Sequence, residues 1–147
     1  MSILILYGTS EGQTRKIAEF VSDIFGARGH NVALVDATST TVSAVDLGEF
    51  DAIVIAASLH VGRYQTQVED FVREHSQALD EMHTMFLSVS LSAASDDPED
   101  VKGLRDCAAT FLGSTKWTPG EIHHVAGAFK YTQYDFFKRW AMKFIAF

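Results

Sequence analysis

The sequence predicts an α/β fold, a doubly wound five-stranded parallel sheet with helices on both faces. Short continuous apolar runs, typical of strands that are buried on both sides, alternate with segments of helical periodicity. A strand, a helix and a further strand in succession form a βαβ unit whose two strands lie parallel. Because such crossovers are right-handed and ligands bind beyond the carboxyl ends of the strands, we expect a functional site in the loops after strands one, three and four.

The first strand and helix are predicted from the N-terminal residues. Ser2–Tyr7 is an apolar run that ends at Gly8, and a helix follows from about Thr14. Gly29 is a suitable C-terminal stop for this helix. Its apolar stripe consists of Ile17, Val21, Ile24 and Phe25.

Two more strands are predicted before the second helix. Asn31–Val35 is the second strand, and Asp51–Ala57 is a third that reads as fully buried. The segment between them, Thr38–Phe50, is polar and irregular, and we expect one helical turn near Val45.

The second half repeats the alternation. Gln65–Leu79 is predicted as a helix, and Met85–Leu91 as the fourth strand. After a loop at Ser92–Asp97, Pro98 suits the first turn of a helix that continues to about Leu112. A turn at Trp117–Gly120 precedes the fifth strand, for which we expect the bounds Ile122–Phe129.

Length and composition limit the function classes. The 147 residues fit one domain over residues 1–147, and the single cysteine cannot form an internal disulfide. No run is long and apolar enough for a membrane span, and Met1–Tyr7 lacks the basic lead-in of a signal peptide. We therefore expect a cytoplasmic protein. The net charge of −7 argues against nucleic acid as a partner.

The charge is unevenly distributed along the chain. Residues 1–127 carry 8 Lys and Arg against 18 Asp and Glu, a net charge of −10. Residues 128–147 carry 4 against 1, a net charge of +3, together with 8 of the 17 aromatic residues. The sequence is thus an acidic body with a basic, aromatic end.

The loop after the first strand has the features of a phosphate-binding site. Gly8-Thr9-Ser10-Glu11-Gly12-Gln13-Thr14 leads from a strand into a helix, whose free N–H groups and positive end attract phosphate. The loop offers hydroxyl donors and no Lys or Arg, which suits a terminal monophosphate. The spacing fits neither GxxxxGK[ST] nor GxGxxG. A simple helix cap by Ser and Thr is the alternative interpretation.

With this loop the sequence resembles the flavodoxin family, whose phosphate loop is T-x-[ST]-G-x-T and whose strand order is 2-1-3-4-5, with flavin mononucleotide (FMN) at the switch point. Further segments resemble the flavodoxin-like, quinone-dependent protoporphyrinogen dehydrogenases of bacteria. These segments are Ala57–Tyr64, Phe86–Leu91, Trp117–Pro119 and Ala126–Tyr131, followed by the basic aromatic stretch Tyr134–Phe147. The resemblance covers essentially the whole chain, and the Trp117-to-Tyr131 part is its most discriminating portion.

The resemblance implies an FMN site built from three segments. The phosphate would be held by Thr9, Ser10, Glu11, Gly12, Gln13 and Thr14. One side of the isoalloxazine would be lined by Ser58, Leu59, His60, Val61, Gly62 and Tyr64. The other would be lined by Ser88, Val89, Ser90, Leu91 and Ser92, with backbone N–H groups toward the polar edge of the flavin.

The chain departs from that family in two places. Where the family commonly has Arg-Tyr, this sequence has His60-Val61, so a propionate-bearing substrate would meet a cation only when the imidazole is protonated. The family also continues beyond the position of Phe147, including the last helix of the fold. Either Gln133–Phe147 supplies that helix, or the chain is part of a longer one.

The C-terminal segment, residues 132–147, is predicted to be a helix with two possible roles. An apolar stripe is formed by Phe137, Trp140, Ala141 and Phe144, flanked by Lys138, Arg139 and Lys143. Such a helix can lie in a membrane interface, near a lipid-soluble quinone, or it can pack its stripe on the sheet. We favour the membrane role, mainly through the resemblance.

Other candidate sites have simpler interpretations. His123 and His124 are neighbours on a strand and point to opposite faces, so we expect no metal site. Cys107 suits a small buried position. The acidic run Asp96–Asp100 could dock an electron-transfer partner, but it also lies at a helix N-terminus, where carboxylates are favoured.

The first hypothesis, implied by the resemblance, is an FMN enzyme that oxidises protoporphyrinogen IX to protoporphyrin IX, a step of haem biosynthesis, with a quinone as electron acceptor. No catalytic acid or base can be assigned. The alternatives are a flavodoxin-type electron carrier or FMN quinone reductase without a porphyrin substrate, and a flavin-free interaction module. The basic end counts against a carrier, since carriers are typically acidic throughout.

Overall fold

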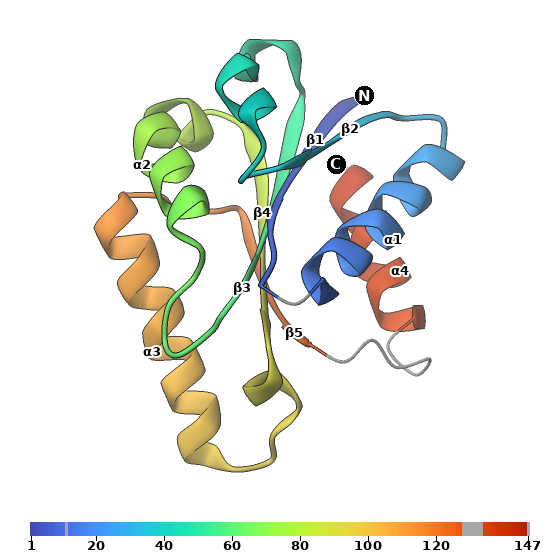
Figure 1. The fold of residues 1–147 in the computed structure, drawn as a ribbon. Helices are drawn as coiled ribbons and strands as arrows, with labels where there is room; N and C mark the ends of the chain where they lie inside the picture. The colour runs from blue at the N-terminus through green and yellow to red at the C-terminus, as the bar shows by residue number, and fades with distance from the viewer. Residues whose placement is uncertain (11, 128–133, 147) are drawn as a thin grey trace.

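The computed structural model describes residues 1–10, 12–127 and 134–146. Five parallel strands form one sheet in the order β2-β1-β3-β4-β5, as predicted. The strands are β1 Ser2–Gly8, β2 Asn31–Asp36, β3 Ala52–Ser58, β4 His83–Ser90 and β5 Glu121–Ala126. The helices are α1 Gln13–Ala27, α2 Thr66–Asp80, α3 Pro98–Thr115 and α4 Tyr134–Ile145. Helices α1 and α4 cover one face of the sheet and α2 and α3 the other (Figure 1).

Each predicted strand and helix is present, and the differences lie at element ends and in the connections. Two short 3-10 helices, Thr40–Ala44 and Leu47–Glu49, occupy the polar segment for which one turn was expected. A third, η3 at Leu91–Ala94, follows β4 directly. The fifth strand ends at Ala126, and Phe129, its predicted end, lies outside the described residues.

Local sequence explains where α3 begins. The Asp97 carboxylate accepts a hydrogen bond from the N–H of Glu99 at 2.9 Å, which caps the helix. Pro98 occupies the first helical position, where its missing N–H costs nothing. The acidic run therefore has a structural role at this helix end.

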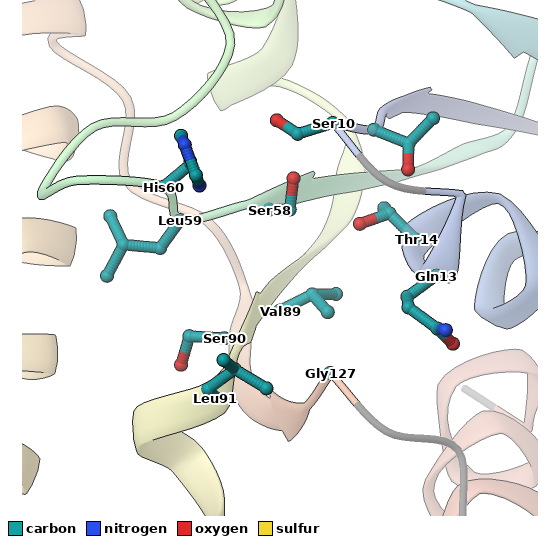
Figure 2. A pocket seen from close by; sticks show the side chains of 11 residues that line it. Ser10, Gln13, Thr14, Ser58, Leu59, His60, Val89, Ser90, Leu91 and Gly127 are labelled. Carbon is teal, nitrogen blue, oxygen red and sulfur yellow. The ribbon is translucent and has the colours of Figure 1, made fainter.

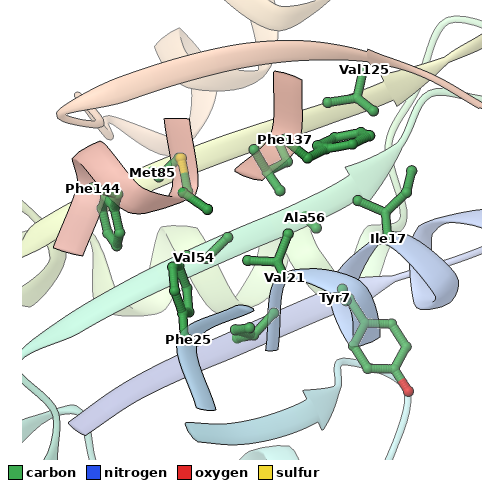
Figure 3. Packing of buried hydrophobic residues seen from close by; sticks show 14 of the residues in the cluster. Tyr7, Ile17, Val21, Phe25, Val54, Ala56, Met85, Val125, Phe137 and Phe144 are labelled. Carbon is green, nitrogen blue, oxygen red and sulfur yellow. The ribbon is translucent and has the colours of Figure 1, made fainter. Parts of the chain in front are cut away.

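The final helix packs its aromatic stripe on the sheet (Figure 3). Phe137, Trp140, Ala141 and Phe144 are all 5% exposed or less. Phe144 stacks on Phe25 of α1 with ring centroids 6.1 Å apart, so α1 and α4 share one core layer. The favoured role of this stripe as a membrane-facing surface is therefore wrong, because the sheet and α1 already bury it. The segment instead forms α4, which covers this face of the sheet beside α1.

Candidate functional site

A pocket opens at the carboxyl edge of the sheet, where the chain leaves β1, β3, β4 and β5 (Figure 2). Its volume is about 190 Å³. The lining residues are Thr9, Ser10, Gln13, Thr14, Ser58, Leu59, His60, Val89, Ser90, Leu91 and Gly127. The structure thus brings together members of all three segments that the sequence singled out, at the edge where a parallel sheet binds ligands.

The loop after β1 forms one end of the pocket. Gly12 has a positive φ of 86°, a conformation that glycine adopts without strain, and its N–H donates to Thr9 Oγ1 at 2.8 Å. Helix α1 begins at the next residue, and its first N–H groups have no acceptor within the helix. This end of the pocket therefore presents a positive helix terminus. Glu11, one of the predicted site residues, lies outside the described residues.

Thr14 carries a polar atom that the protein itself leaves unused. The residue is completely buried and lines the pocket, yet its Oγ1 has no hydrogen-bond partner. A buried hydroxyl without a partner is unfavourable, and such groups are rare in folded proteins. A phosphate oxygen at this position would accept its hydrogen bond. A helix cap alone does not account for Thr14, because α1 has no side-chain cap hydrogen bond.

Gln65, which is not among the predicted site residues, connects the loops around the pocket. Its side chain accepts from the N–H of Ser58 at 3.1 Å and donates to Ser10 Oγ at 2.9 Å and to Ser58 Oγ. Gly8 makes room for it, since a Cβ at this position would lie 2.9 Å from Gln65 Oε1 and 2.7 Å from Val68 Cγ2. The loops after β1 and β3 are therefore held at a defined separation.

The segment after β3 is a tight turn. His60 and Arg63 exchange two backbone hydrogen bonds, of 2.8 and 3.1 Å. Between them Val61 and Gly62 both have positive φ, 49° and 77°. Of the predicted flavin contacts in this segment, Ser58, Leu59 and His60 line the pocket, whereas Val61 and Gly62 form the tip of the turn.

Two predicted contacts, Tyr64 and Ser88, lie in the core and are not among the residues that line the pocket. The Tyr64 hydroxyl and Ser88 Oγ are 2.7 Å apart and share a hydrogen bond. Burial raises the pKa of Tyr64 to about 12, and the hydrogen bond with Ser88 opposes part of that rise. This pair fixes the end of the turn against β4 from inside the protein.

The segment after β4 forms the other side of the pocket. Ser90 Oγ accepts from the N–H of Ala93 at 3.2 Å and so begins η3. The carbonyl of Ser90 also accepts from the N–H of Gly127 at 2.9 Å, which brings the end of β5 to the pocket. Val89, Ser90 and Leu91, which are predicted flavin contacts, line the pocket, and Gly127 is a further lining residue. Ser92, also predicted, lies inside η3 and does not line it.

The side chains that line the pocket carry almost no charge. Among the described residues that line the pocket, His60 is the single ionisable side chain, and hydroxyl and amide groups supply the rest of the polar surface. Neutral donors at a helix N-terminus suit a phosphate monoester, and aliphatic side chains near Leu59 and Leu91 suit a planar ring. The described residues therefore form a pocket with one polar and one apolar end.

Within the described ranges, no group of three or more His, Cys, Asp or Glu side chains is arranged to hold a metal ion. No helix of the described chain has the length and hydropathy that a membrane span requires.

Comparison with known proteins agrees with this geometry. A family model described as a flavodoxin domain matches residues 4–146. The protoporphyrinogen IX dehydrogenase [quinone] of Escherichia coli K12 is 30% identical over 148 residues, which cover 99% of this chain and 78% of that protein. A protein of the same name from Leishmania major is 27% identical over 150 residues, 97% of this chain and 61% of the relative.

Solved structures share the fold. A flavodoxin from Streptococcus pneumoniae TIGR4 superposes with a TM-score of 0.75 at 19% identity, and the alignment covers 99% of both chains. Oxidised flavodoxin 2 from Bacillus cereus gives a TM-score of 0.72 at 19% identity, over 99% of this chain and 98% of the other.

Proposed function

Because the chain belongs to the flavodoxin domain family, we propose that it is an FMN-dependent oxidoreductase that oxidises protoporphyrinogen IX to protoporphyrin IX and passes the electrons to a quinone. The substrate and the acceptor are those for which its relatives from E. coli and L. major are named. The observation that carries the cofactor assignment is the buried, unpartnered hydroxyl of Thr14 at the N-terminus of α1.

The residues that would hold FMN fall into two groups. Thr9, Ser10, Gln13 and Thr14 with the first N–H groups of α1 would bind the phosphate, as the neutral donors there suit a monoester. Ser58, Leu59 and His60 on one side, and Val89, Ser90 and Leu91 on the other, would flank the ring. Gly12, Val61, Gly62 and Ser92 would act through loop conformation, and Glu11 stays a predicted member of the phosphate loop.

When bound, FMN would supply the two-electron redox chemistry. The protein would bind and orient it, since the Gln65 hydrogen bonds hold the loops after β1 and β3 at a set distance. The aliphatic side chains of Leu59, Val89 and Leu91 would exclude water from the ring. Among the described residues that line the pocket, His60 is the one ionisable side chain, and we assign it no catalytic step.

The proposed location is the cytoplasm, with attachment to the cytoplasmic face of the membrane, where a lipid-soluble quinone is available. The outer face of α4 supports this proposal, because Lys138, Arg139 and Lys143 are exposed beside a half-exposed Phe136. The stripe in the core takes no part in this contact.

The first test is the absorbance spectrum of the purified protein after FMN addition, followed by anaerobic oxidation of protoporphyrinogen with and without a quinone. We expect flavin absorbance and porphyrin formation that depends on the quinone. Flavin binding and quinone reduction without porphyrin formation would indicate an FMN quinone reductase instead. Flavin binding without quinone turnover would indicate the carrier that the flavodoxin fold also allows. A colourless protein would indicate the flavin-free interaction module.

A further inference from the structure

The two most exposed large apolar side chains of the described chain belong to the segments after β3 and β4, which both contribute to the pocket lining. Val61 is 88% exposed and Leu91 is 81% exposed. The other large apolar side chains on the described surface, Leu34, Ile122 and Phe136, are between 37% and 54% exposed. Leu91 lines the pocket, and Val61 directly follows His60, which lines it from the opposite segment. Exposed apolar side chains on the two segments that flank the pocket are typical of a contact surface.

Folding does not explain the valine at position 61. Its φ of 49° lies in the left-handed region, where a β-branched residue is strained and where Gly or Asn is favoured. Gly62 follows with a φ of 77°, so the two residues are the centre of a turn that Asn-Gly forms most readily. At 88% exposure the side chain also gains little from burial. A valine here is unfavourable for both backbone and solvation unless something covers it.

The charges around the pocket indicate what that partner is. The described pocket lining has no Asp, Glu, Lys or Arg. Beyond η3, which Leu91 begins, the chain carries four exposed carboxylates, Asp96, Asp97, Glu99 and Asp100. This acidic segment disfavours an anionic ligand over Leu91 and leaves an uncharged one unaffected.

We propose that Val61 and Leu91 form an apolar lip that contacts the uncharged quinone while it accepts electrons at the pocket. The proposal rests on the proposed function and specifies which residues receive its acceptor. Bound FMN in its reduced form would supply the two electrons and, with solvent, the two protons that convert the two carbonyl oxygens of the quinone to hydroxyls. The lip contributes contact area to this encounter and no proton.

The test compares two oxidants on the same protein. The FMN-saturated protein is reduced anaerobically with dithionite and then mixed with either a decyl-substituted benzoquinone or ferricyanide, and the rate of flavin reoxidation is followed by absorbance. The variants are Val61→Asn, Leu91→Gln and the double substitution. Val61→Asn suits the turn, so folding is retained. Leu34→Gln, on edge strand β2, is the matched control for loss of an exposed apolar side chain.

We expect the ratio of the quinone rate to the ferricyanide rate to fall about tenfold in the double variant, because the quinone loses apolar contact area and ferricyanide does not. Any effect of Leu91→Gln on the bound flavin enters both rates, which is why their ratio is the readout. The Leu34→Gln ratio should equal that of the unaltered protein. An unchanged ratio in the double variant overturns the lip. If Val61 and Leu91 contact lipid or a second copy of the chain instead, the double variant will differ from the unaltered protein in vesicle flotation or in gel-filtration elution volume. The ratio of the two rates will then stay unchanged, and this result also overturns the proposal. If the unaltered protein reduces no quinone, the result overturns the proposed function itself and, with it, the role of the lip.

Discussion

At the scale of single residues, substitution of Thr14 tests whether the loop after β1 is a ligand site or only a helix cap. Its buried hydroxyl has no partner in the protein alone, so Thr14→Val should leave the stability of the apoprotein unchanged or raise it by about 1 kcal/mol. The same substitution should weaken FMN binding about five- to tenfold, because a hydrogen bond to the phosphate is lost. Thermal unfolding of the apoprotein and quenching of FMN fluorescence measure the two effects.

Thr14→Ser is the matched control, because it keeps the hydroxyl and removes the methyl group. It should retain most of the FMN affinity. A Thr14→Val protein that is destabilised without FMN and binds FMN normally would show that the hydroxyl supports the fold and not a ligand.

Gly8 is the residue whose side chain the site cannot accommodate. A Cβ there would approach Val68 Cγ2 to 2.7 Å and Gln65 Oε1 to 2.9 Å, so Gly8→Ala should destabilise the protein by about 1–3 kcal/mol. Displacement of Gln65 should also weaken FMN binding. Gly113→Ala, within α3, is the control, because a Cβ added there would meet no heavy atom within 4 Å beyond the backbone of its own helix. That variant should be stabilised by up to about 1 kcal/mol. Equal melting temperatures for the two variants would argue against the close contact.

At the scale of elements, two histidines on the sheet contact the aromatic stripe of α4. His123 of β5 stacks on Trp140 with centroids 4.7 Å apart, and His83 Nε2–H donates to the carbonyl of Phe144 at 2.7 Å. Burial lowers the pKa of His123, and nearby Glu121 partly opposes this. The pKa of His124 is also lowered, by burial and then by the positive charge of Arg105. Protonation of His123 and His124 is therefore less favourable in the folded protein.

The stability of the β5–α4 contact should decrease in acid. A histidine whose folded pKa is lowered stays neutral in the native state while the unfolded chain takes up a proton near pH 6.5. The free energy of unfolding is then highest above that pH and falls as the pH drops toward the folded pKa, by up to about 1.4 kcal/mol per pH unit for each histidine. Urea unfolding between pH 5 and 8 measures this slope.

His123→Phe is the variant that isolates this contribution, because it keeps a ring against Trp140 and removes the titrating group. Its stability should fall less between pH 7 and 5 than that of the unaltered protein. Parallel curves would mean that other groups, such as carboxylates, cause the acid sensitivity.

The same helix shows where sequence reasoning stops. Strand order, helix positions and most of the pocket lining could be predicted, because they follow from local periodicity and from the ends of parallel strands. The partner of the α4 stripe could not, since an apolar stripe shows that a surface is covered and not what covers it. Gln65 was missed because its hydrogen bonds to Ser10 and Ser58 exist only after two loops meet. Tyr64 and Ser88 were assigned to the pocket, but their side chains point into the core.

At the scale of the whole molecule, charge is separated between the body and α4. Residues 1–127 have a net charge of −10, and the outer face of α4 exposes Lys138, Arg139 and Lys143 against one carboxylate, Asp135. Because the opposite face of the helix is buried in the core, α4 cannot insert into a membrane without unfolding the protein. It can lie against an anionic lipid surface with its outer face, where Phe136 is 54% exposed.

Removal of the helix is therefore a poor test of membrane binding, since it would expose the core, and substitution of its outer face is the informative one. We expect the protein to float with anionic vesicles at low salt and to dissociate at high salt, because surface attraction is screened. The triple variant Lys138→Gln, Arg139→Gln, Lys143→Gln should lose most of this binding, at about 1 kcal/mol per cation near the surface.

The matched control removes the same charge from α1, α2 and α3 with the substitutions Arg15→Gln, Arg73→Gln and Lys102→Gln. If both triple variants lose binding equally, net charge and not α4 controls the interaction. If neither does, the basic face of α4 makes no membrane contact, and the quinone must reach the pocket without it.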